Sequence, residues 1–302
     1  MSRRSWTALL LLASLWGASY LFVAIGLDDL SPSMIVLSRT LLAGLVLLPL
    51  ALRRGALRGM RGVLGPIAIL AAVQVAGPFL LISAGQRDIP SSLAGILVAS
   101  APIFTALLAV WVDHDERSSG WRLGGVGIGI VGVGLLLGVD TAGDSAALIG
   151  GVLVLVASLG YAIGSLYLKR RLGGIAPLGI VAATMLASAA MVAPLALATA
   201  PPALPGLDTV GAMLALGIAG TGIAFVIFYT LIASVGPARA SIVAYIAPVF
   251  AVFYGVTLLG ESVGPATFAG LALILGGSWL AAGGYERTPA AVPAPVPALV
   301  RD

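Results

Sequence analysis

Side chains that can exchange a proton near neutral pH are scarce in this sequence, which holds 12 acidic residues and one histidine among 302 residues. All the acids lie between long apolar runs, at the ends of these runs or near the chain termini. His114 lies in the polar stretch Asp113–Arg117, and the chain has no cysteine. Disulfides, thiol catalysis and Cys metal sites are therefore excluded.

This distribution argues against an enzyme. Intramembrane proteolysis would need an embedded histidine beside a serine, or two buried aspartates, and the apolar runs hold neither. A lipid-linked transferase would use an acidic metal site, and the one acidic cluster, Asp113, Asp115 and Glu116, has basic neighbours. We predict no catalytic residue, no metal and no cofactor, and an intramembrane enzyme stays a remote alternative.

Arg39 is the one ionised side chain inside an apolar run, seven residues after Pro32. A charge at that depth is costly and usually faces protein or water. Two interpretations stay open: a cation that binds a carboxylate or acts in gating, and a structural arginine that caps carbonyls or reaches the outer face. Pro102 and Pro248 lie about halfway along two other runs, where each removes a backbone hydrogen bond. With Arg39 they are candidates for a gate or hinge, although static kinks are the alternative.

Aromatic side chains recur four residues apart, hence on one face of a helix, at Trp16 and Tyr20 and at Phe225 and Tyr229. A cavity with aromatic walls and a few polar groups suits a small amphipathic or aromatic ligand. Tryptophan and tyrosine also pack between helices or lie at the headgroup level. The candidate substrate-binding residues are Trp16, Tyr20, Gln74, Pro78, Ser100, Phe104, Tyr161, Phe225, Tyr229 and Tyr245.

The elements that must position these residues are helices in a membrane. The chain is 60% hydrophobic and only 9% charged, which is too little charge to cover a soluble domain of this length. A helix needs about 20 apolar residues to cross the hydrocarbon. We predict an all-α membrane protein with ten transmembrane helices, at about 6–26, 32–52, 63–84, 91–112, 121–139, 147–168, 176–198, 209–233, 237–259 and 264–285.

Basic residues give the orientation. If the N-terminus is cytoplasmic, every Lys and Arg except Arg39 and Arg87 falls at the cytoplasmic side, as the positive-inside rule requires. We predict a multi-pass protein of the bacterial inner membrane with both termini in the cytoplasm. The basic residues form short clusters between apolar runs, so the net charge of +4 does not indicate nucleic-acid binding.

The two halves of the chain resemble each other at a shift of about 145 residues. The motif at 101–104, Ala-Pro-Ile-Phe, recurs at 247–250 as Ala-Pro-Val-Phe, and Trp16 corresponds to Tyr161. Because each half has five helices, the second half enters the membrane from the opposite side, as in many secondary transporters. The predicted divisions are a cytoplasmic N-terminus at 1–5, a first five-helix repeat at 6–139, a second, inverted repeat at 147–285 and a disordered cytoplasmic tail at 286–302.

These motifs carry a family resemblance. With Trp16-Gly17, Arg39, the two Ala-Pro-x-Phe motifs and Gly260-Glu261, the chain resembles the ten-helix EamA-type exporters of the drug/metabolite transporter superfamily. In the first half, Asp115-Glu116 stands where the second half has Gly260-Glu261. The resemblance implies a basket of helices around a central cavity and the export of amino acids or related metabolites. The likeness to bacterial aromatic amino-acid exporters is the closest.

We therefore predict an exporter that works by alternating access on a small-molecule substrate, with membrane lipid as its other partner. Proton-driven pumps generally carry a buried acid or histidine that titrates, so its lack in the apolar runs predicts facilitated diffusion. Efflux of drugs or nucleosides is the alternative. A phosphorylated substrate would need several cationic side chains, and only Arg39 is available. Glycine-rich helices allow a dimer, but packing within one chain is favoured, hence a monomer.

Overall fold

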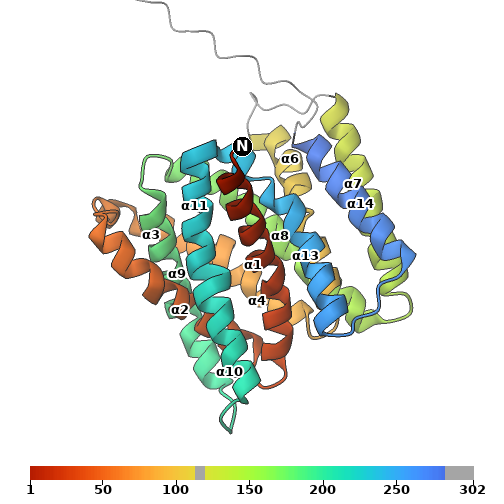
Figure 1. Cartoon of the computed structure of the whole chain (residues 1–302), viewed down its shortest axis with the longest axis horizontal. Helices are drawn as coiled ribbons and strands as arrows, with labels where there is room; N and C mark the ends of the chain where they lie inside the picture. Colours follow the sequence, from red (N-terminus) through yellow and green to blue (C-terminus); the bar gives the residue numbers. More distant parts are fainter. Residues whose placement is uncertain (113–119, 283–302) are drawn as a thin grey trace, which may run out of the picture.

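The computed structural model of the chain describes residues 1–112 and 120–282, and all regular secondary structure in these ranges is helical (Figure 1). The predicted tail at 286–302, His114 and the acidic cluster around Glu116 lie outside the described residues. The prediction of ten membrane-spanning helices in two inverted repeats around a central cavity is confirmed. The six unbroken spans are α1 (Arg3–Leu27), α2 (Pro32–Arg53), α7 (Gly120–Asp140), α8 (Ser145–Arg171), α9 (Pro177–Ala198) and α14 (Pro265–Ala281).

The other four spans are broken, which the apolar runs did not predict. In the third and eighth spans a π-helical segment interrupts the α-helix, and in the fourth and ninth spans a short turn does so. The third span consists of η1 (Met60–Val63), α3 (Leu64–Leu70), η2 (Ala71–Ala76) and α4 (Gly77–Gly85), and the fourth of α5 (Ser91–Val98) and α6 (Ala101–Val112). The eighth consists of α10 (Leu207–Leu214), η4 (Ala215–Ile223) and α11 (Ala224–Val235), and the ninth of α12 (Pro237–Ala240) and α13 (Val243–Leu258).

The two π-helical segments, η2 and η4, fall at corresponding places in the two halves, which adds to the evidence for the repeat. In the first half Pro78 follows η2, and a proline ring excludes the usual bond to the carbonyl four residues before it. In the second half no proline follows η4. There the Thr221 hydroxyl donates to the carbonyl of Leu216, five residues earlier, at 2.8 Å. Segments of this kind occur often at functional sites.

The lengths and surfaces of the helices fit a bilayer. Eight of the described helical spans have 18 or more residues and are apolar enough to cross a membrane. The last two apolar helices, α13 and α14, are shorter, with 16 and 17 residues, or about 25 Å at 1.5 Å per residue. Large apolar side chains such as Leu45, Ile149 and Leu197 are exposed on the outside of the bundle, where lipid covers them.

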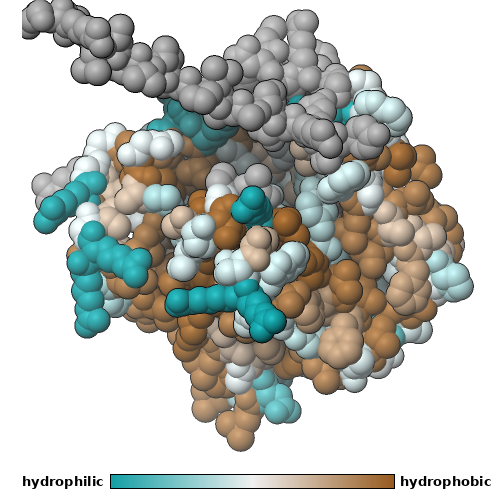
Figure 2. Space-filling model, turned by 45° about the horizontal axis from the view of Figure 1, so that its top comes forward, coloured by the Kyte–Doolittle hydropathy of each residue, from teal (hydrophilic) through white to brown (hydrophobic). Residues whose placement is uncertain are grey.

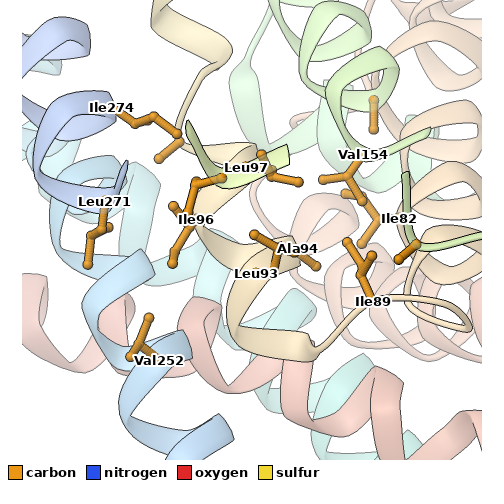
Figure 3. Packing of buried hydrophobic residues seen from close by; sticks show 14 residues of the cluster. Ile82, Ile89, Leu93, Ala94, Ile96, Leu97, Val154, Val252, Leu271 and Ile274 are labelled. Atoms are coloured by element: carbon orange, nitrogen blue, oxygen red, sulfur yellow. The ribbon is translucent and has the colours of Figure 1, made fainter. Parts of the chain in front are cut away.

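Helices of opposite halves pack in pairs: α7 against α14, α2 against α9, and α1 against α13. Figure 1 shows α7 and α14 side by side along one edge of the bundle. The largest buried apolar cluster joins Ile96 and Leu97 of α5 to Val154 of α8 and to Leu271 and Ile274 of α14 (Figure 3). The core therefore lies between the repeats and holds them together.

The two ends of the bundle differ in charge. The end at which α1 begins, here called the N-terminal end, carries most of the basic residues: Arg3, Arg4, Arg53, Arg54, Arg58, Arg122, Lys169, Arg170, Arg171 and Arg239. The opposite end carries Arg87 together with several acids, among them Asp28, Asp29, Asp88, Asp144, Asp208 and Glu261. Figure 2, in which the N-terminal end is turned toward the viewer, shows hydrophilic side chains gathered there above a largely hydrophobic flank.

Polar contacts join helices of the two halves at the opposite end. The Asp29 carboxylate accepts hydrogen bonds from the Thr209 hydroxyl at 2.6 Å and from the Gly206 N–H at 2.8 Å. The bond from Thr209 and then that from Gly206 hold the pKa of Asp29 below its usual range. The hydroxyls of Ser33 and Thr199 lie 2.7 Å apart. These contacts tie the first two spans to the seventh and eighth.

Candidate substrate-binding cavity

A cavity of about 810 Å³ lies within the bundle and is lined by residues of both halves. This volume is within the range of about 300–1,000 Å³ that is usual for small-molecule sites. The lining is mostly apolar and aromatic, with Ser19, Gln74 and Thr184 among its polar members. Its charged residues among those the structure describes are Arg39 and Arg122, and no Asp or Glu belongs to it. The described lining therefore carries positive charge alone.

The structure brings most of the predicted site residues to this cavity. Those in the lining are Trp16, Tyr20, Arg39, Gln74, Pro102, Tyr161, Phe225, Tyr229, Tyr245 and Pro248. Three predicted residues are outside it. Pro78 is buried against α8, where a Cβ on Gly160 would lie 3.0 Å from its Cγ, and Ser100 is buried and donates to the Leu97 carbonyl at 2.6 Å. Phe104 lies beside the face of α6 that lines the cavity, which is formed by residues 101, 102, 105 and 106.

Trp16 is the centre of an aromatic wall. Its ring centroid lies 5.2 Å from that of Phe228 and 6.0 Å from that of Phe225. The Phe225 ring stacks in turn on Tyr229, with centroids 6.3 Å apart. These rings come from α1 and α11, so the wall crosses the interface between the repeats. The spacing of four residues that marks the aromatic pairs in the sequence does not mark Phe228, because Phe228 follows Phe225 by three residues.

Arg39 lies in the cavity wall and is held from two sides. Its Nε donates a hydrogen bond to the Thr221 hydroxyl at 2.9 Å, and its Cζ lies 3.7 Å from the centroid of the Phe79 ring. An arginine over an aromatic face gains a cation–π attraction. Within the described residues the hydrogen bond to Thr221 is the only one Arg39 makes, so no described bond caps a carbonyl. The structure therefore does not support the alternative that Arg39 caps backbone carbonyls.

The prediction that Pro102 lies about halfway along a continuous helix is wrong. Helix α5 ends at Val98, and Pro102 is the second residue of α6, where its missing N–H needs no partner. In the turn, the Leu97 carbonyl accepts hydrogen bonds from both the hydroxyl and the N–H of Ser100. Pro248 does lie inside a helix, α13, and both prolines line the cavity. The two copies of the motif thus differ: the first begins a helix after a turn, and the second lies within a helix.

Among the described residues, the cavity reaches the surface at the N-terminal end of the bundle. Its lining there includes Arg122, the third residue of α7, and the exposed residues Ser241 and Ala282. Toward the opposite end the lining stops at Val23, Ile82 and Gly95, a few residues short of the helix ends.

Two further contacts close the opposite end below the cavity. The Gln86 side-chain amide donates to the Tyr20 carbonyl at 3.0 Å. The Glu261 carboxylate accepts hydrogen bonds from the N–H groups of Ser91 and Ser92 at 2.6 and 2.9 Å. A cavity between inverted repeats that is open at one end and closed at the other is one of the two states that alternating access requires.

These features together define a membrane transporter rather than an enzyme. The chain belongs to the EamA-like transporter family, whose sequence pattern matches it twice, over residues 4–138 and 148–283. It is a multi-pass protein of the inner membrane with a small-molecule substrate.

Similar proteins agree with this assignment. YedA of Escherichia coli, described as an uncharacterized inner membrane transporter, is 31% identical over 274 residues, covering 89% of this chain and 87% of YedA. A probable amino-acid metabolite efflux pump of Salmonella typhimurium is 24% identical, covering 95% of this chain and 97% of the pump. A solved crystal structure has the same fold, with a TM-score of 0.67, 24% sequence identity and coverage of 95% of this chain and all of the other.

Proposed function

We propose that this protein exports amino acids, aromatic ones preferentially, or related small metabolites across the inner membrane by alternating access. The observation that carries the proposal is the aromatic wall around Trp16, which crosses the interface between the repeats and lines a cavity open at one end. Such a wall suits an apolar ring, because offset and edge-to-face ring contacts add about 0.5–1.5 kcal/mol to area burial. The name of the Salmonella relative, an amino-acid metabolite efflux pump, supports the substrate class.

The direction of transport rests on the charge of the two ends. The N-terminal end carries the basic clusters and the opposite end the acids, which favours cytoplasmic termini under the positive-inside rule. The cavity then opens to the cytoplasm, where an exporter loads its substrate.

Counterflow in liposomes tests the substrate assignment. Full-length protein should take up labelled phenylalanine when the liposomes are loaded with unlabelled phenylalanine, and Trp16→Ala should lower the initial rate about tenfold, because it removes ring contacts worth roughly 1–1.5 kcal/mol. The control is Trp279→Ala, since Trp279 lies on α14, outside the lining, and is 46% exposed. Equal losses in both variants, or uptake of aliphatic amino acids in preference to aromatic ones, would refute the aromatic assignment.

Facilitated diffusion is supported by the lining, which contains no Asp or Glu among the described residues. A proton-coupled carrier would be expected to hold such a group in the cavity. Collapsing the pH gradient across the liposome membrane is therefore expected to leave the steady level of phenylalanine unchanged. A fall of that level by half or more would show proton coupling.

A further inference from the structure

We propose that Arg39 binds the carboxylate of the substrate, and that the cavity selects its ligands by the carboxylate rather than by the amine. This inference rests on the proposed function, because it concerns ligands of the amino-acid class in the same cavity. It differs from a gating role in assigning Arg39 a direct contact with the ligand.

Arg39 has hydrogen-bonding capacity that the described residues do not use. A guanidinium carries five N–H donors and no acceptor. One of them, on Nε, is bonded to Thr221, and Phe79 covers one face of the planar group. The four donors on the two terminal nitrogens have no hydrogen bond within the described residues. Two such nitrogens side by side match the two oxygens of a carboxylate.

Arg39 has no counter-charge among the described residues of the cavity lining. An ionised arginine inside a membrane is costly and normally pairs with an acid or a carbonyl. The described lining of the cavity has no acid, and the nearest described contacts of Arg39 are a neutral hydroxyl and an aromatic ring. A ligand carboxylate would supply this counter-charge in a mostly apolar cavity, where a charge-assisted bond is stronger than in water.

Thr221 positions the guanidinium of Arg39. Thr221 is completely buried in the π-helical segment η4, and its hydroxyl proton is engaged by the Leu216 carbonyl. The oxygen of the hydroxyl is therefore left as an acceptor for Nε of Arg39. This hydrogen bond holds Nε of Arg39 toward Thr221, so the two terminal nitrogens point away from Thr221. Thr221 is accordingly a positioning residue.

The positions of Arg39 and of the aromatic wall also explain where the rest of the ligand would bind. Arg39 and the aromatic wall around Trp16 line the same cavity, so a carboxylate at Arg39 leaves the apolar part of the ligand to the wall. An ammonium group would have aromatic faces and hydroxyls as its described neighbours, and no acid. The amine should therefore contribute less to binding than the carboxylate does.

Competition in the liposome assay tests the selectivity. Unlabelled 3-phenylpropionate, which lacks the amine, should inhibit uptake of labelled phenylalanine by the unmodified protein, and phenethylamine, which lacks the carboxylate, should inhibit at least tenfold more weakly. Equal inhibition by both compounds, or stronger inhibition by phenethylamine, would overturn the proposal.

Variants assign the selectivity to Arg39. Arg39→Gln should raise the KM for phenylalanine at least tenfold and abolish the preference for 3-phenylpropionate over phenethylamine. Thr221→Val should raise the KM about fivefold, and Thr221→Ser, which keeps the hydroxyl, should restore it. The control is Arg87→Gln, at the opposite end and outside the lining. Loss of rate in Arg39→Gln with an unchanged KM and unchanged selectivity would indicate a gating role and overturn the assignment.

A binding measurement separates this inference from the proposed function. Equilibrium dialysis of labelled 3-phenylpropionate against the full chain in detergent needs no transport, and gel filtration checks that each variant is folded. Binding that disappears in folded Arg39→Gln supports the carboxylate site even if no amino acid is transported. Absence of binding to the unmodified protein, or equal binding to folded Arg39→Gln, overturns the site even if phenylalanine is exported.

Discussion

Replacing Gly277 of α14 by alanine is expected to destabilise the folded protein by about 3 kcal/mol, the upper part of the range for overpacking a close contact. The added Cβ would lie 2.5 Å from the backbone N of Gly129 and 2.6 Å from the carbonyl oxygen of Gly125, both on α7. Backbone atoms of a helix cannot rotate away as a flexible side chain can, so the two helices must separate. Close helix approach at small residues is a main source of stability in membranes.

The matched control is the neighbouring residue. Gly276→Ala adds the same methyl group one position earlier, where no atom lies within 4 Å, so it should leave stability unchanged or raise it slightly. The measurement is the apparent melting temperature in detergent, from the monodisperse fraction in gel filtration after heating. The Gly277 variant should melt several degrees lower than the Gly276 variant. Equal melting temperatures would show that α7 and α14 do not pack at this distance.

The fold was largely predictable because the length of an apolar run and the spacing of basic clusters report directly on the crossing of a membrane. The predicted run at 32–52 and the observed α2 (Pro32–Arg53), for example, agree within one residue. The π-helical segments were not predictable in this way. They depend on which carbonyl each backbone N–H reaches, and apolar composition is the same in either case.

The cavity was predictable only where a chemical feature marked one face of a helix. The aromatic pairs at Trp16 with Tyr20 and at Phe225 with Tyr229 were marked by their spacing, and Arg39 by its charge. Thr221 was missed because it is a buried residue outside the lining that nothing in the sequence marks as a partner of Arg39. Phe79 and Phe228, which do line the cavity, were missed because a transmembrane helix is apolar on all sides, so periodicity does not separate the face toward lipid from the face toward the cavity. For the same reason Phe104 was placed in the lining although it lies outside it.

Arg122 was missed for another reason. From the sequence it is one of the basic residues that predict the orientation in the membrane, whereas in the structure it lies in the mouth of the cavity. Both roles are compatible, because the mouth and the basic clusters are at the same end of the bundle.

Glu261→Ala is expected to expose the first amides of α5 at the closed end of the cavity. Glu261 follows α13 in the second repeat, and its carboxylate accepts the N–H groups of Ser91 and Ser92, the first two residues of a helix in the first repeat. The residue before them, Pro90, makes no capping hydrogen bond with its side chain. The first N–H groups of a helix have no partner within it and carry partial positive charge, so the carboxylate both satisfies and neutralises them.

The local sequence is built to place this carboxylate. Gly260 has a φ of +68°, which favours glycine and turns the chain after α13. Gly255 leaves room for the side chain, since a Cβ there would overlap Oε2 of Glu261. Gly255→Ala should therefore displace the carboxylate and act on the same two bonds. The effects of Gly255→Ala and Glu261→Ala should then be less than additive in the double variant.

Loss of two hydrogen bonds to a charged group is expected to cost about 3 kcal/mol of local stability, or roughly a hundredfold faster exchange of the two amides. Hydrogen–deuterium exchange of peptides from 90–98 measures the exchange rate of these amides. Glu261→Gln keeps one acceptor oxygen and should therefore give an intermediate rate. Since the contact joins the two repeats at the closed end, its loss should also favour the state open at that end. Unchanged exchange in folded Glu261→Ala would show that water caps α5 as well as the carboxylate does, and that the closure depends on the contacts of Asp29 and Gln86 instead.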